Sequence, residues 1–125
     1  RVVGLGAAIE YVSELGYPAI ETQEAALVDQ ALESLQDIPG LRLVGKPQNR
    51  KGIVSFLVAD IHPHDLGTVL DQEGVANRAG HHCAQPTMKR FGVPATARAS
   101  LAFYNTEQDV DALIDALVTV KEIFA

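Results

Sequence analysis

The residues most able to do chemistry in this sequence lie in one short segment, which holds Cys83, the two histidines before it and Arg78. Positive side chains favour the thiolate form of a nearby cysteine, and the thiolate is the reactive nucleophile. Gly80 and Pro86 stand on either side of the cysteine and predict an irregular loop, where reactive groups are often displayed. The segment therefore predicts a nucleophilic Cys83, and the alternative is a small, buried and inert cysteine.

The two histidines, His81 and His82, are adjacent in sequence. Their side chains therefore point in different directions, and at most one of them can face Cys83. We take His82 as the candidate that would tune the acidity of the thiol. The alternative for each histidine is a structural role, in which a hydrogen bond holds the ring.

The histidines and the cysteine also allow a metal-binding interpretation, because His62-x-His64 and His81-His82-Cys83 supply five candidate ligands. Structural zinc sites usually contain paired Cys-x-x-Cys motifs or histidines at helical spacing. The spacing in this sequence matches neither pattern, so we predict no metal site.

Arg98 is a further candidate, because it is a charged side chain among small residues in a predicted strand. If it points inward it needs a partner, since burying a lone guanidinium is costly. A carboxylate that binds through two contacts is the natural match for a guanidinium. The alternative is an arginine that faces outward on an exposed sheet edge.

The charges of the chain are segregated along the sequence. The formal net charge is −6, and an acidic chain is poorly suited to nucleic acid, whose phosphates require a positive surface. Residues 2–41 contain acids but no lysine or arginine, as expected for solvated helix surfaces. Residues 74–106 contain bases but no acid, which indicates either a carboxylate or phosphate site or an ordinary basic surface. These bases are Arg78, Lys89, Arg90 and Arg98.

Hydrophobic periodicity predicts an α+β domain in which a small, mostly antiparallel sheet is covered by helices. Two neighbouring β-rich segments near the middle of the chain indicate antiparallel pairing. The first predicted helix precedes the other elements as an appendage and could belong to a neighbouring domain. Helices are predicted at 4–15, 20–36, 62–72 and after the N-cap Thr106, with one helical turn at 87–91, and strands at 41–44, 53–58, 75–78 and 97–103.

The composition is that of a soluble globular domain: the chain has 125 residues, of which 47% are hydrophobic and 21% are charged. No apolar run approaches the roughly 20 residues of a membrane span, so no membrane partner is expected. A single cysteine cannot form an internal disulfide, which indicates a reducing compartment, the cytoplasm. Because the sequence begins with Arg1, we expect a processed product or an excised fragment.

A wider set of residues forms a specific pattern: 78–86 reads Arg-Ala-Gly-His-His-Cys-Ala-Gln-Pro, 91–101 reads Phe-Gly-Val-Pro-Ala-Thr-Ala-Arg-Ala-Ser-Leu, and 103–106 reads Phe-Tyr-Asn-Thr. This pattern resembles the C-terminal part of the group II cysteine desulfurases, the Suf-type enzymes of iron–sulfur cluster assembly within the class V aminotransferases. The resemblance implies the small C-terminal domain of a fold type I enzyme at 17–125. Residues 1–16 would then be the trailing helix of a missing large domain.

The resemblance also implies roles for individual residues. The family's enzymes are pyridoxal-phosphate-dependent homodimers that convert L-cysteine to L-alanine and leave a persulfide on a cysteine that Cys83 matches. Arg98 matches the arginine that binds the substrate carboxylate, and Arg78 matches a second arginine of the active-site region. The persulfide sulfur passes to an acceptor such as a SufE-like or SufU-like protein.

The sequence departs from the family pattern in two respects. Asn77 and Thr87 stand where apolar residues are expected, and no lysine stands in the Schiff-base context of the family, which has a histidine before the lysine. We therefore expect pyridoxal phosphate in the full-length enzyme but no covalent attachment to this chain, and no desulfurase activity from the chain alone. The alternatives are a relative that acts on selenocysteine or cysteine sulfinate, and a stand-alone persulfide-carrier or interaction domain.

Overall fold

The structure, a computed structural model, describes residues 2–125 and is built on an antiparallel sheet. β4 pairs antiparallel with both β2 and β3, while β1 pairs only with β2 among the described strands. β4 is therefore an inner strand that is held from both sides. The four described strands, in the order β1-β2-β4-β3 across the sheet, are β1 (Leu41–Val44), β2 (Ile53–Val58), β4 (Thr96–Ser100) and β3 (Arg78–Gly80).

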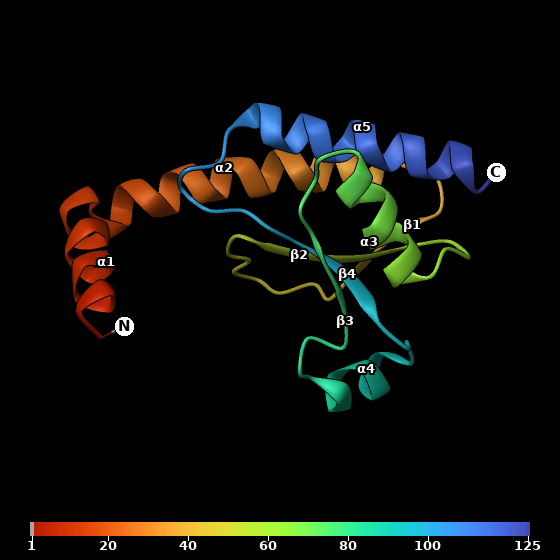
Figure 1. Ribbon diagram of the computed structural model, residues 1–125, viewed down its shortest axis with the longest axis horizontal. Coiled ribbons are helices and arrows are strands. Elements are labelled where there is room, and N and C mark those ends of the chain that lie inside the picture. Colours follow the sequence, from red (N-terminus) through yellow and green to blue (C-terminus); the bar gives the residue numbers. More distant parts are fainter. Residues whose placement is uncertain (1) are drawn as a thin grey trace.

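The helices form two unequal layers on the sheet (Figure 1). The helices α2, α3 and α5 lie along one face, with α2 and α5 side by side, while the short α4 lies on the opposite side. α1 turns away from the start of α2. The described helices are α1 (Val2–Leu15), α2 (Tyr17–Gln36), α3 (Pro63–Gln72), α4 (Gln85–Phe91) and α5 (Glu107–Ile123).

The hydrophobic core lies between the sheet and the larger helix layer. Alternate residues of β2 are fully buried in it, with Phe56 at its centre. Ala97 and Ala99 of β4 face the same core, where their small side chains allow the helices to pack closely. Successive side chains of a strand point to opposite faces, so Thr96 and Arg98 point away from this core.

Polar groups at the helix starts fix where two of the helices begin. The N-cap of α3 is His62, whose Nδ1 atom accepts a hydrogen bond from the backbone N–H of His64 at 3.2 Å, and Pro63 stands in the first turn as predicted. The N-cap of α5 is Thr106, also as predicted. Its backbone N–H donates to Oδ2 of Asp109 at 2.8 Å, which is half of a capping box.

α1 contains no buried residue. One of its contacts is between the rings of Tyr11 and Phe103, whose centroids are 6.1 Å apart. Gly16, with a φ of 82°, separates α1 from α2 at the predicted position. The division into residues 1–16 and 17–125 stays a prediction. None of the described helices combines the length and hydrophobicity needed to cross a bilayer.

The predicted α+β architecture is confirmed, but two predicted strands have wrong boundaries. The strand predicted at 75–78 begins only at residue 78, because the N–H of Val75 donates to the carbonyl of Leu70 and completes the end of α3. The strand predicted at 97–103 spans 96–100 instead. It stops there because the N–H of Ala102 donates to the side chain of Asn105 at 2.9 Å in a turn.

The helix boundaries also differ from the prediction at their N-terminal ends. The helix predicted from residue 20 begins at Tyr17, and the turn predicted from residue 87 begins at Gln85. Both begin just before a proline, which suits the first turn of a helix because its missing N–H would have no helical partner there. The helix predicted at 4–15 begins two residues earlier, at Val2.

Candidate active site on the open face of the sheet

The face of the sheet turned away from the large helix layer carries a row of polar side chains from three strands. Ser55 of β2 lies opposite Arg98 of β4, and Arg98 lies opposite Arg78 of β3. Directly opposed residues of an antiparallel pair point to the same face, with Cβ atoms about 4.5–5.5 Å apart. The sheet therefore brings together the two arginines that were singled out from the sequence.

Neither arginine is paired with an acidic side chain in the described part of the chain, where the ion pair is Lys51–Glu21. Arg98 is half-buried, and its Nε atom is buried without a hydrogen-bond partner among residues 2–125. An unpartnered buried donor and two like charges side by side both cost free energy. An anion bound on this face would offset the repulsion between the two arginines. The alternative of an arginine on an exposed sheet edge is wrong, because β4 is an inner strand.

A cleft of about 260 Å³ separates this face from α4 and contains Arg98. Ser55, His82 and Arg98 supply charged or polar side chains to its lining. Met88 and Phe91 of α4 supply apolar side chains. A mostly apolar recess with a few convergent polar groups is the usual form of a site for a small molecule.

Cys83 lies in the turn between β3 and α4, and its side chain is exposed. Gly80 ends β3 with a φ of 128°, which is chiefly open to glycine. His82 and Cys83 follow, each with a φ of 55° in the left-handed region. Residues other than glycine adopt this region at a cost, and such strain clusters at functional sites. Because the side chain of Cys83 is exposed, the alternative of a buried cysteine is wrong. The reactivity of Cys83 stays a prediction.

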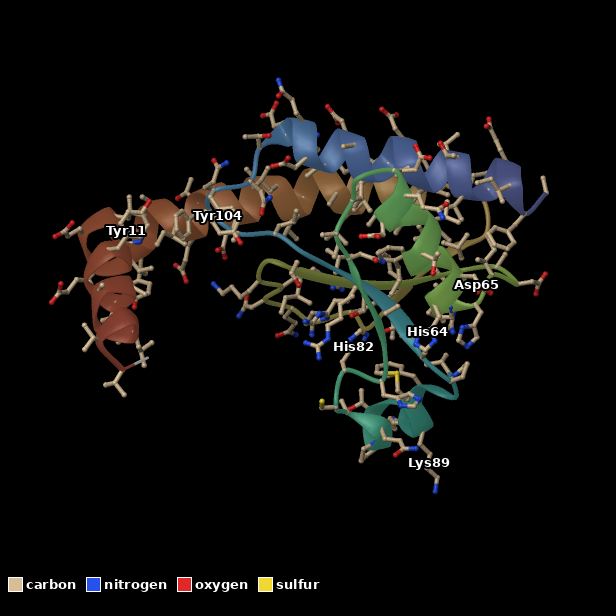
Figure 2. The ribbon with its side chains drawn as sticks, viewed as in Figure 1. Tyr11, His64, Asp65, His82, Lys89 and Tyr104 are labelled. Carbon is tan, nitrogen blue, oxygen red and sulfur yellow. The ribbon has the colours of Figure 1, made fainter. Side chains whose placement is uncertain are left out.

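The ring of His82 lies against the sheet (Figure 2). Its Nε2 atom is 2.8 Å from Oγ1 and 3.1 Å from the carbonyl oxygen of Thr96, a β4 residue that is only 1% exposed. Burial lowers the pKa of His82, and the positive charge of Arg98 lowers it further, so the neutral ring is favoured. Both contacts of Nε2 go to Thr96. Tuning of the Cys83 thiol by His82 therefore stays a prediction.

Comparison with known proteins decides the family to which this arrangement belongs. Residues 1–113 match the family model described as aminotransferase class-V. The chain belongs to the class-V aminotransferases. The class-V membership implied by the cysteine and arginine motifs is thereby confirmed.

This class-V chain is similar to curated proteins named "Probable cysteine desulfurase". One from Staphylococcus epidermidis is 51% identical over 126 residues, covering 100% of this chain and 30% of the relative. One from Streptomyces coelicolor is 46% identical over 126 residues, covering 99% of this chain and 30% of the relative. The chain thus spans about 30% of the length of the curated relatives it matches.

The fold of this class-V domain is similar to that of solved cysteine desulfurases. The crystal structure of the cysteine desulfurase CsdA from Escherichia coli matches with a TM-score of 0.91 and 38% identity, over 98% of this chain and 30% of that chain. The apo structure of a cysteine desulfurase from Thermococcus onnurineus matches with a TM-score of 0.89 and 38% identity, over 96% of this chain and 30% of that chain.

Sequence reasoning did not identify two residues of the site, Ser55 and Thr96. Thr96 stands two positions before Arg98, and residues two apart in a strand share a face. The strand was predicted to begin at residue 97, one position too late to include Thr96. Ser55 carries no such signal. Its place beside Arg98 follows from the register between β2 and β4, which depends on the whole fold.

The other histidines of this class-V domain have separate surroundings. The rings of His62 and His64 meet edge to face at the start of α3, with centroids 5.1 Å apart. His81 lines a different groove, together with Met88 and Lys89 of α4. Within residues 2–125, no three side chains of the His, Cys, Asp and Glu types come together in a group that could hold a metal ion.

Proposed function

We propose that this chain is the small C-terminal domain of a Suf-type cysteine desulfurase, at residues 17–125, with 1–16 trailing from the large domain. In this proposal Arg98, with Arg78 beside it, binds the carboxylate of L-cysteine, and Cys83 takes up the sulfur. The observation that carries the proposal is the cross-strand arginine pair. It has no acidic partner among the described residues, and it lies on the face next to the cysteine turn.

A carboxylate suits this arginine pair in both geometry and charge. A guanidinium binds a carboxylate through two parallel hydrogen bonds, and Arg98 lines the cleft with no acidic partner among the described residues. A negative charge near Arg78 and Arg98 would also offset the repulsion between them. The hydroxyl of Ser55, next in the row, can donate a further hydrogen bond.

The family implies pyridoxal phosphate, which when bound supplies an electron sink for cleavage of a carbon–sulfur bond. The lysines of this chain do not fit its covalent attachment. No lysine lines the cleft around Arg98 in the described residues. Lys51 is paired with Glu21, and Lys89, in the last turn of α4, points away from the sheet (Figure 2). We therefore assign the attachment to the part of the enzyme outside this chain.

The thiolate of Cys83 attacks the sulfur atom of L-cysteine in the proposed reaction. A sulfur–sulfur bond forms and the carbon–sulfur bond of the substrate breaks. The carbon keeps the electron pair of that bond and gains a proton, so the products are L-alanine and a persulfide on Cys83. An exposed turn allows the persulfide to meet an acceptor protein, for which we propose a SufE-like or SufU-like partner in iron–sulfur cluster assembly. The proposed enzyme is a homodimer in the cytoplasm.

The proposal is tested with the complete enzyme that contains this chain, purified with bound pyridoxal phosphate. We expect L-cysteine to yield equal amounts of L-alanine and persulfide sulfur, and we expect neither product from the 125-residue chain alone. Absence of alanine formation by the complete enzyme would contradict the proposal. Faster turnover of selenocysteine or cysteine sulfinate would assign the enzyme to one of those related activities instead.

A further inference from the structure

The turn that carries Cys83 has an unfavourable backbone conformation. His82 and Cys83 are consecutive, and both have a φ of 55° although neither is glycine. The left-handed region is disfavoured for L-residues because Cβ comes too close to the following carbonyl oxygen. Two such residues in succession persist only where surrounding contacts hold them.

The side chain of His82 provides a contact that ties this turn to the sheet. Its Nε2 atom reaches the hydroxyl of Thr96 at 2.8 Å and the carbonyl oxygen of Thr96 at 3.1 Å. Thr96 is a firm anchor, because it is 1% exposed and belongs to an inner strand. Within the turn, the N–H of Ala84 donates to the carbonyl of His81 at 2.9 Å, a local bond that does not connect the turn to the sheet.

The contacts favour one tautomer of the His82 ring. A carbonyl oxygen only accepts, so the contact with the Thr96 carbonyl is a hydrogen bond when Nε2 carries the hydrogen, and Nδ1 then carries a lone pair. Nδ1 is buried without a partner in the described part of the chain. A neutral ring of this kind adds no third positive charge beside Arg98 and Arg78.

We propose that His82 is a positioning residue for Cys83: its hydrogen bonds to Thr96 hold the left-handed turn and so fix the thiol at the edge of the cleft that contains Arg98. His82 and Ala84 both line that cleft, and Cys83 is the residue between them. His82 acts through the backbone and does not take the proton of the thiol. The expected effect on turnover rests on the proposed function, whereas the effect on the turn itself does not.

Two substitutions in the complete enzyme separate positioning from proton transfer. His82→Gln keeps an N–H donor of similar reach but no titrating ring, and His82→Leu removes the donor. We expect His82→Leu to lower kcat by up to about 100-fold, the loss associated with a misplacement of about 1 Å, with little change in KM because Arg98 is intact. His82→Gln should restore most of kcat. The pH midpoint for alkylation of Cys83 by iodoacetamide should be the same in His82→Gln and in the unsubstituted enzyme.

Hydrogen–deuterium exchange of the peptide that covers residues 81–86 tests the turn without any need for activity. Exchange should be faster in His82→Leu than in the unsubstituted enzyme, close to normal in His82→Gln, and intermediate in Thr96→Val, which removes only the hydroxyl. Normal exchange in His82→Leu would overturn the proposal. So would a His82→Gln variant whose kcat and exchange are changed as much as those of His82→Leu, or whose alkylation midpoint for Cys83 is shifted. An unsubstituted enzyme that makes no alanine contradicts the proposed function instead, and the exchange and alkylation results still decide the role of His82.

Discussion

Arg78 and Arg98 stand directly opposite each other on β3 and β4, on the face of the sheet that the large helix layer leaves open. The pairing sets two positive side chains next to each other with no carboxylate beside them in the described residues. A chain selected only for stability would not favour this pairing, since like charges at opposed positions destabilise a sheet. The relationship is best explained by a negatively charged ligand, and two of the predictions below test it.

Removal of the Arg98 guanidinium should weaken substrate binding in the complete enzyme. We expect Arg98→Ala to raise KM for L-cysteine about 10- to 100-fold, since a hydrogen bond to a charged group contributes roughly 1.5–3 kcal/mol. Arg90→Ala is the matched control, because it removes an exposed cation from the last turn of α4 and should leave KM unchanged. Steady-state kinetics decide the matter, and an unchanged KM in Arg98→Ala would show that Arg98 is structural.

Removal of the Arg78 side chain should have opposite effects on stability and on binding. In the absence of substrate, Arg78→Ala relieves the repulsion between the two arginines and should raise the free energy of unfolding by less than about 1 kcal/mol. The same variant should bind L-cysteine more weakly. Chemical denaturation without ligand measures the first effect. A clear loss of stability would mean that Arg78 makes favourable contacts and does not simply repel Arg98.

Acidification should destabilise the protein through His82. Burial and the charge of Arg98 lower the pKa of His82, so the folded state binds the proton less readily than the unfolded chain, whose histidines titrate at about 6.5. The stabilising contribution of the neutral ring is complete above about pH 6.5 and is lost as the pH falls through the lowered pKa. The thermal midpoint should therefore fall more on acidification in the unsubstituted protein than in His82→Gln. An equal fall of the thermal midpoint in the two proteins would show that protonation of His82 does not cause the acid destabilisation.

Asp109 should stabilise the start of α5. Its pKa is lowered by the hydrogen bond from the backbone N–H of Thr106 and by a second one from the side chain of Asn105. Asp109→Ala should lower the thermal midpoint at neutral pH, whereas Asp115→Ala, at an exposed position of the same helix, should change it little. The difference between the two variants should vanish as the pH falls through the lowered pKa of Asp109, because the carboxylate is then protonated. Equal midpoints at neutral pH would show that this cap is dispensable.

Elements defined by local pattern were predictable from the sequence, and those defined by long-range pairing were less so. The amphipathic stripe of α5 and its N-cap Thr106 lie within a few residues of each other, so periodicity and capping chemistry suffice. β3 was misplaced because Val75 has strand propensity but completes the end of α3 through its bond to Leu70. A hydrogen bond that ends a helix outweighs the intrinsic preference of a single valine.

The same distinction holds for the site. The types and spacing of Cys83, His82 and Arg98 drew attention to them in the sequence. The opposition of Arg78 and Arg98, however, follows from strand register, and the bond from His82 to Thr96 joins residues 14 positions apart. Neither relationship has a local sequence signal. The sequence therefore indicated which residues to consider, and the fold was needed to find which of them meet.

Mass spectrometry of the peptide that contains Cys83 tests the central claim most directly. The complete enzyme is mixed with L-cysteine, quenched with an alkylating reagent and digested, and Cys83→Ser is treated in the same way. The account predicts that Cys83 gains one sulfur atom, that L-alanine appears in equal amount, and that the variant, which keeps the exposed turn without the thiol, gains no sulfur. Alanine formation with the added sulfur on another residue, or with no sulfur on the protein, would contradict the role assigned to Cys83.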